Sequence, residues 1–168
     1  MSTQLALKPI AFLTLFLLCA ANGLAQMPNP YGPPINLENA KRFAVPALAE
    51  AAKNGWTMAV AVVDPGGNLV YFEKMDNTQL GSVEVAIEKA RSAALFKRPT
   101  KAFQDTLAAG AEGLRVLRLT GAVPTEGGVP IVTEAVGAIG VSGGTYQQDG
   151  QCAKAALDAV IVHRQSLS

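Results

Sequence analysis

Residues 127–149 read GGVPIVTEAVGAIGVSGGTYQQD, two short apolar runs bracketed by glycines and followed by a Ser-Gly-Gly-Thr turn. Short β-rich runs punctuated by glycine predict strands whose backbones come close to another group. A glycine-rich turn from a strand into a helix is also where free backbone N–H groups collect. We therefore predict a pair of neighbouring strands here, and we expect a ligand to lie against this stretch.

The sequence before this stretch predicts a second strand pair. Residues 58–63 (MAVAVV) form a continuous apolar run, and a DPGGN turn separates them from LVYFEK at residues 69–74. The other expected elements are helices at residues 37–54, 80–97, 101–109 and 147–163, strands at 130–134 and 136–141, and an ambiguous segment at 114–119. Hairpins mixed with helices, without regular strand–helix alternation, predict an α+β fold with an antiparallel sheet.

The first 25 residues have the pattern of an export signal. Lys8 is the only charged residue before an apolar run at residues 9–21, and small residues at 23–25 predict cleavage after Ala25. Residues 26–36 are a proline-rich stretch expected to be a flexible arm, and residues 37–168 are expected to form one domain. The protein is therefore predicted to be secreted or periplasmic, with no membrane span in the mature chain.

The charge and cysteine content exclude some classes of protein. The formal net charge is +1, and no basic cluster is present, which argues against nucleic acid as a partner. Of the two cysteines, Cys19 lies in the expected signal and Cys152 remains alone, so no internal disulfide is expected. The fold must therefore depend on its hydrophobic core.

Two glycine-rich segments are candidate ligand contacts. The turn formed by Ser142, Gly143, Gly144 and Thr145 could present N–H groups to a carboxylate at the start of the last helix. The alternative is that these residues only make a sharp turn and cap the helix. Gly127–Gly128, just before a predicted strand, could bring the backbone close to a ligand or a neighbouring subunit, or could simply form a tight turn.

Charged residues outside the glycine-rich segments are also candidates. Lys74, Met75 and Asp76 follow a predicted strand, where the two charged side chains could line a polar pocket wall or form a surface salt bridge. Lys89 lies among small and apolar residues of its helix. It could reach a ligand carboxylate, or it could extend along the apolar surface to water.

No catalytic or metal-binding constellation is recognisable. His163 is the only histidine, and it has no Cys, Asp or Glu at ligand spacing, so no metal site is predicted. Tyr71, Tyr146, Met75 and Cys152 are conceivable axial ligands of a haem iron, but their spacing marks none of them. No nucleophile–base pair, dinucleotide fingerprint or P-loop is present, so the sequence favours a binding protein over an enzyme.

Four segments in order resemble one family. They are VAVVDPGGNLVYFEKMDN (residues 60–77), EKARSAALFKRPT (88–100), GGVPI (127–131) and GAIGVSGGTYQQD (137–149) with the helix QCAKAALDA after it (151–159). The chain is similar to the GlcG/HbpS-like family of haem-binding or haem-degrading proteins, which is related to the C-terminal domain of PduO-type proteins. It differs in having Lys74 where the family often has arginine, in a shorter second hairpin, and in lacking the histidine that some members use as a macrocycle ligand.

The resemblance implies a profilin-like α+β fold with a central antiparallel sheet of about five strands flanked by helices. It also implies an oligomer, from dimer to octamer, and a haem or related tetrapyrrole as ligand, with a role in haem handling or in redox or haem sensing. Two other functions remain open: an enzyme or accessory factor acting on a small organic acid in glycolate-type catabolism, and a structural or assembly module without a ligand.

Overall fold

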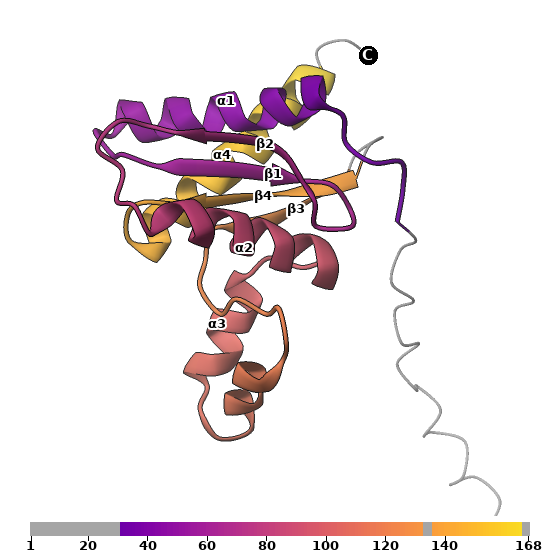
Figure 1. Cartoon of the computed structure of the whole chain (residues 1–168), viewed down its shortest axis with the longest axis vertical. Coiled ribbons are helices and arrows are strands. Elements are labelled where there is room, and N and C mark those ends of the chain that lie inside the picture. Colours follow the sequence, from indigo (N-terminus) through magenta and orange to yellow (C-terminus); the bar gives the residue numbers. More distant parts are fainter. Residues whose placement is uncertain (1–30, 133–135, 166–168) are drawn as a thin grey trace, which may run out of the picture.

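The structure, a computed structural model, describes residues 31–132 and 136–165, with side chains described as far as residue 160. The expected export signal and residues 26–30 of the expected arm therefore lie outside the described residues, as does the connection at 133–135. The elements follow in the order α1 (Leu37–Lys53), β1 (Ala59–Val63), β2 (Leu69–Lys74), α2 (Ser82–Phe96), α3 (Lys101–Ala108), the 3-10 helix η1 (Ala111–Arg118), β3 (Gly128–Val132), β4 (Val136–Ser142) and α4 (Tyr146–Gln165) (Figure 1).

The described strands form one antiparallel sheet in the order β2-β1-β4-β3. The predicted α+β class and antiparallel sheet are thus confirmed. The expected number of strands was slightly too high, because four are described rather than about five. The ambiguous segment at residues 114–119 lies mostly in η1, so it adds a helical turn and not a strand to the fold.

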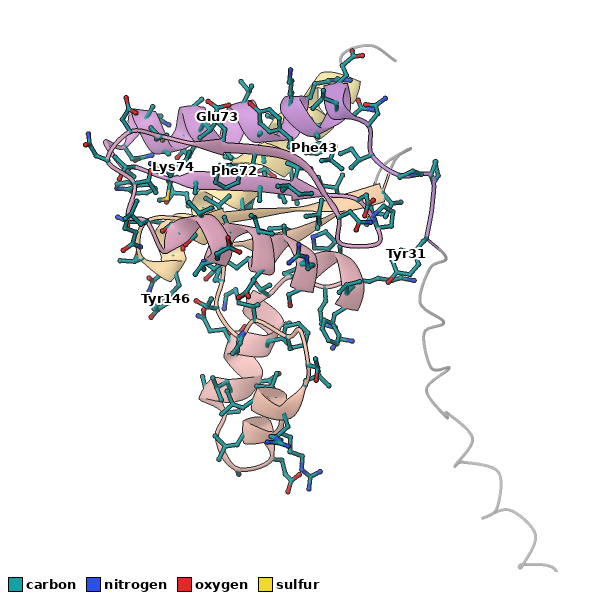
Figure 2. All side chains as sticks on the ribbon, viewed as in Figure 1. Tyr31, Phe43, Phe72, Glu73, Lys74 and Tyr146 are labelled. Carbon is teal, nitrogen blue, oxygen red and sulfur yellow. The ribbon has the colours of Figure 1, made fainter. Side chains whose placement is uncertain are left out.

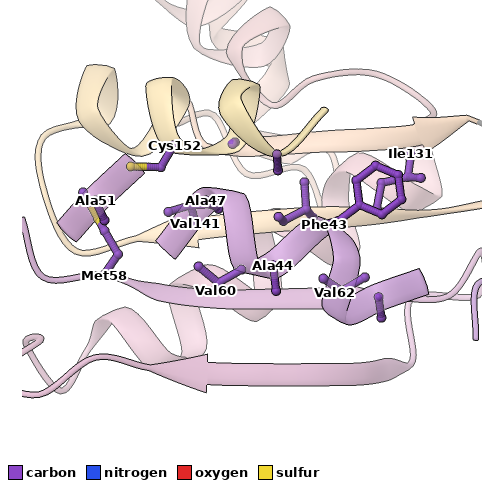
Figure 3. Packing of buried hydrophobic residues seen from close by; sticks show 14 of the residues in the cluster. Phe43, Ala44, Ala47, Ala51, Met58, Val60, Val62, Ile131, Val141 and Cys152 are labelled. Atoms are coloured by element: carbon purple, nitrogen blue, oxygen red, sulfur yellow. The ribbon is translucent and has the colours of Figure 1, made fainter. Parts of the chain in front are cut away.

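Helices cover both faces of the sheet. α1 and α4 lie side by side on one face, and α2 lies on the other (Figure 1). The strand β1 is buried along its whole length, and its side chains alternate between the two faces. Val60 and Val62 pack toward α1 and α4 in the larger hydrophobic cluster (Figure 3), while Ala59, Ala61 and Val63 pack toward α2.

The contact between α2 and the sheet is unusually close because small residues line it. Ala86 and Ala90 of α2 pack on Gly140 of β4, where an added Cβ would collide with the carbonyl oxygen of Ala86. The short distance between α2 and β4 also brings the Lys89 ammonium within hydrogen-bonding distance of the Val141 carbonyl, near the end of β4. The small residues therefore set how close the Lys89 ammonium lies to β4.

Local hydrogen bonds define the ends of several elements. Asn36 caps α1, since its Oδ1 accepts from the Asn39 N–H at 2.9 Å, as its side chain predicts. The β1–β2 turn is closed by Asp64, whose Oδ1 accepts from the N–H groups of Gly66 and Asn68. Ile35 is buried and donates its N–H to the Val136 carbonyl, so the chain just before α1 is held against β4.

Candidate functional site

The residues that the sequence singled out come together at one end of the sheet. Ala59 pairs with Lys74 of β2 on one side and with Ser142 of β4 on the other, and Gly128 pairs with Gly140 of β4. Because neighbouring strands are antiparallel, the last residues of β2 and β4 and the first residues of β3 meet at this end of the sheet. Figure 2 shows Lys74 and Tyr146, the first residue of α4, at this same end of the molecule.

A buried ion pair lies at the centre of this region. The Lys89 Nζ is 2.7 Å from Oδ2 of Asp149, and the two side chains are only 2% and 4% exposed. The ammonium also donates to the Val141 carbonyl at 3.1 Å, and Oδ1 of Asp149 accepts from the Gly144 N–H at 3.0 Å. Burial raises the pKa of the Asp149 carboxyl above its ordinary value, and the Lys89 ammonium and the Gly144 N–H limit that rise.

Lys89 therefore meets a carboxylate, but one that belongs to the protein. The expectation that its chain would extend to water is wrong, because the close packing of α2 on the sheet leaves the ammonium inside. Sequence patterning did not identify Asp149 as its partner, since 60 positions separate the two residues. We refer to Lys89, Asp149, Gly127, Gly128 and the turn at residues 142–145 together as the glycine corner.

Gly127, just before β3, and Gly128, the first residue of that strand, make room for this ion pair. Gly127 has a φ of +124°, and a Cβ added there would lie 2.6 Å from the Val141 carbonyl oxygen and 3.0 Å from the Lys89 Nζ. A Cβ on Gly128 would lie 2.6 Å from Cγ2 of Thr100, whose hydroxyl accepts the Gly128 N–H. The close approach that the sequence predicted is thus made by Lys89 and Thr100.

The turn at residues 142–145 acts as a helix cap. The Thr145 hydroxyl accepts from the Gln148 N–H, and the Gln148 side chain accepts in return from the Thr145 N–H at 2.9 Å. This reciprocal arrangement is a capping box. With the Gly144 N–H bound to Asp149, the turn uses two of its donors internally. The capping alternative therefore describes the geometry, and contact of this turn with a ligand stays a prediction.

The Lys74–Asp76 segment lies at the same end of the sheet, where the outer strand β2 ends. The Lys74 and Asp76 side chains are exposed, and the structure shows no ion pair between them within the described residues. Met75 is partly buried against the larger hydrophobic cluster, and its N–H donates to the Met58 carbonyl at 2.9 Å. The backbone of this segment is thus anchored, while its charged groups face the solvent.

The conceivable iron ligands are mostly engaged elsewhere. The Tyr71 hydroxyl donates to Glu73, which raises the pKa of the tyrosine. Cys152 is buried, and burial raises the pKa of its thiol to about 12. Tyr146 is half-exposed, and His163 falls in the part of α4 whose side chains are not described. Among the described residues, no group of three or more His, Cys, Asp or Glu could hold a metal ion.

A cavity of about 380 Å³ opens in front of the glycine corner. Gly127 and Gly128 form part of its wall, and the helix α4 supplies Gln147 and Gln151. Lys101 and Lys154 also line it, but each forms an ion pair with an aspartate of its own helix, and Glu126 adds a carboxylate. This cavity can offer amide and ammonium donors to a small polar ligand.

A larger groove of about 530 Å³ lies at the opposite ends of α1 and α4. We refer to it as the α1–α4 groove; it is lined by Glu38, Lys41, Arg42, Val45, Pro46, Ala159 and Val160. No motif in the sequence marks these residues, since charged and apolar side chains on a helix form no distinctive pattern. The available signal was an apolar residue, Val45, placed next to two basic residues on the outer side of the helix.

Three comparisons indicate related proteins. Residues 35–158 match the family model described as "Haem degrading protein HbpS-like". Protein GlcG of Escherichia coli (strain K12) is 41% identical over 95 residues, which cover 55% of this chain and 69% of GlcG.

Two solved structures resemble the fold closely. An HbpS double mutant from Streptomyces reticuli aligns with a TM-score of 0.68 and 28% identity, over 92% of this chain and 98% of HbpS. A PduOC:heme complex aligns with a TM-score of 0.66 and 26% identity, over 74% of this chain and 94% of PduOC.

Proposed function

The chain belongs to the HbpS-like family, and on that premise we propose that it binds haem or a related tetrapyrrole and serves in haem handling or haem or redox sensing. The observation that carries this proposal is the family match over residues 35–158, together with the similarity to a protein whose solved structure is a heme complex. Both cover most of the part of the chain that the structure describes. The proposal concerns binding and assigns no turnover.

The described residues fit the macrocycle and its propionates better than they fit the iron. The α1–α4 groove combines apolar walls with two cationic side chains, which is the chemistry that a flat apolar ring with carboxylates requires. In contrast, Tyr71 is bonded to Glu73 and Cys152 is buried and protonated, so neither is prepared to ligate a metal. When bound, a haem would supply its redox-active iron, and the chain would supply the binding surface.

Export and assembly are further parts of the proposal. The pattern of residues 1–25 supports export to the periplasm or beyond, and no helix among the described residues has the length and hydropathy of a membrane span. A homo-oligomer, from dimer to octamer, is supported by exposed leucines on the part of the chain that extends away from the sheet (Figure 1). These are Leu114, Leu117 and Leu119 in and just after η1.

Titration of the purified protein with haemin tests the proposed function. We expect a saturable shift of the Soret band at micromolar protein, because a specific site orders the macrocycle in an apolar environment. The absence of a saturable shift would refute haem binding. Light scattering of the same sample measures the assembly, and N-terminal sequencing of protein recovered from the periplasm or medium tests cleavage after Ala25.

A second candidate function is binding or conversion of a small organic acid. The cavity in front of the glycine corner favours it, because Gln147, Gln151 and Lys101 can donate hydrogen bonds to a carboxylate. A thermal-shift screen of small carboxylates at millimolar concentration tests this candidate, since a ligand of the folded state raises the melting temperature. If none of them raises it, this function is refuted.

A further inference from the structure

The α1–α4 groove has the composition of a cofactor site. Its apolar lining comes from both helices, with Val45 and Pro46 on α1 and Ala159 and Val160 on α4. Val45 is 59% exposed, so a large apolar surface remains open to solvent. A volume of about 530 Å³ falls within the range typical of sites for small molecules and cofactors.

The charges on the groove are available to a ligand. Lys41 and Arg42 are exposed neighbours on α1 and both line the groove. Within the part of the chain that the structure describes, Arg42 has no hydrogen bond or ion pair, and the Lys41 Nζ lies 5.9 Å from the centre of the Tyr71 ring. Anionic groups could therefore bind both side chains without first displacing a carboxylate of the protein.

We propose that the α1–α4 groove is the tetrapyrrole site, with the ring against its apolar walls and the propionates on Lys41 and Arg42. This inference rests on the proposed function and adds the place and the recognition chemistry. A guanidinium can bind a carboxylate through two parallel hydrogen bonds, and the lysine adds a second positive charge. Burial of the ring edge against Val45, Pro46 and Val160 contributes the apolar part of the binding energy.

The other cavity suits this ligand less well. It is smaller, at about 380 Å³, and each of the two sites has one glutamate in its lining, Glu126 here and Glu38 in the α1–α4 groove. Its two lysines are already paired, Lys101 with Asp105 and Lys154 with Asp158. A dianionic ligand would have to compete with both of these ion pairs, whereas the α1–α4 groove requires no such exchange.

The test compares two charge-removing double variants of the full chain. Lys41→Gln with Arg42→Gln removes the cations of the groove, and Lys101→Gln with Lys154→Gln removes those of the other cavity as a matched control. Haemin binding is followed by the Soret band, and binding of metal-free protoporphyrin by quenching of Trp56, the only tryptophan. Since hydrogen bonds between charged groups are among the stronger ones, we expect the groove variant to bind both ligands at least about tenfold more weakly. The control variant should bind like the wild type.

A third variant tests the apolar wall. Val45→Glu places a carboxylate on the exposed floor of the groove, where it should repel the ring and its propionates while the fold tolerates it. We expect a loss of binding at least as large as for the double variant, at an unchanged melting temperature. Equal losses for haemin and protoporphyrin would assign the effect to ring and propionate recognition and not to the iron.

The outcomes separate this inference from the proposed function. If the wild type binds haemin and the groove variants bind equally well, the groove is not the site, but the proposed function stands. If only the lysine pair of the other cavity matters, the site lies at the glycine corner. If the wild type shows no saturable haemin binding, the function and the site are refuted together.

Discussion

The glycine corner and the α1–α4 groove lie at opposite ends of the α4 helix and differ in almost every physical respect. In the corner, Lys89 and Asp149 are buried and bonded to each other, and the missing side chain of Gly127 leaves room for the ammonium. In the groove, Lys41 and Arg42 are exposed beside an apolar surface. The first region is distinctive in sequence and is occupied by its own side chains. The second is ordinary in sequence and open to a ligand.

A distinctive sequence motif can therefore have its residue types because the fold requires them, and not because a ligand does. Gly127 and Gly128 are needed where Lys89 and Thr100 approach the backbone, and the Ser-Gly-Gly-Thr turn closes a capping box. Gly127 is required by its φ of +124° and Gly128 by the lack of space for a Cβ, whereas the capping box depends on Thr145 and Gln148. A surface that recognises a propionate needs only a cation and an apolar neighbour, which many helices carry.

The strongest test of the glycine corner is Lys89→Met, which keeps a long unbranched side chain but removes its positive charge. The Asp149 carboxylate would be left buried without its partner, so we expect a loss of about 3–5 kcal/mol in the free energy of unfolding. Urea unfolding measures it. The exposed pair of Lys101 and Asp105 provides the control, since Lys101→Met should cause no measurable loss. Equal free energies of unfolding for the two variants would show that the Lys89–Asp149 ion pair does not stabilise the fold more than an exposed pair does.

A second test measures whether the Cys152 thiol, near the glycine corner, is protected from reagents in solution. Burial raises the pKa of Cys152 from 9.0 to about 12, so at pH 8 only about one thiol in ten thousand is ionised, against about one in ten after unfolding. In a Cys19→Ser background, we expect alkylation by iodoacetamide to be about a thousandfold slower in the folded protein than in urea.

The same pKa shift predicts how stability depends on pH. Because the folded state holds the Cys152 proton more tightly than the unfolded state, the free energy of unfolding should fall as the pH rises above about 9. Rapid alkylation of the folded protein at pH 8 would contradict a closed corner.

A third test uses the glycine that makes room for Lys89. Gly127→Ala places a Cβ against the Val141 carbonyl and the Lys89 Nζ at a φ of +124°, so we expect a loss of about 1–3 kcal/mol in thermal or urea unfolding. Gly81→Ala is the matched control. Gly81 has a φ of −62° and no atom within 4 Å of an added Cβ, so alanine should stabilise the fold by about 0.4–1 kcal/mol.

The smallest effect on stability is expected in the groove. Lys41→Gln with Arg42→Gln should leave the urea midpoint of the ligand-free protein unchanged, because the two side chains are exposed and Arg42 has no polar partner among the described residues. The same variant should weaken haemin binding. A marked fall in the midpoint would mean that these residues support the fold, and would remove the contrast between the two regions.

Local patterns in the sequence predicted the elements well. The continuous apolar run at residues 58–63 became the buried β1, and the DPGGN turn and the Asn36 cap formed as their side chains require. The ambiguous segment at 114–119 could not be decided, because the short helical turns of η1 depend on their packing against α3. The expected fifth strand came from the resemblance and not from a pattern in the residues.

The α+β class, the order of the elements and the family could be predicted from residues close together in the chain, because they follow from periodicity, turn residues and short motifs that act over a few positions. The folded chain was needed to show that Lys89 is buried against Asp149, 60 positions away, and that residues of α1 and α4 form a groove. The physical reason is that the partner of a buried charge and the shape of a cavity depend on how helices pack on the sheet. That packing is set by contacts between distant residues, which no local pattern contains.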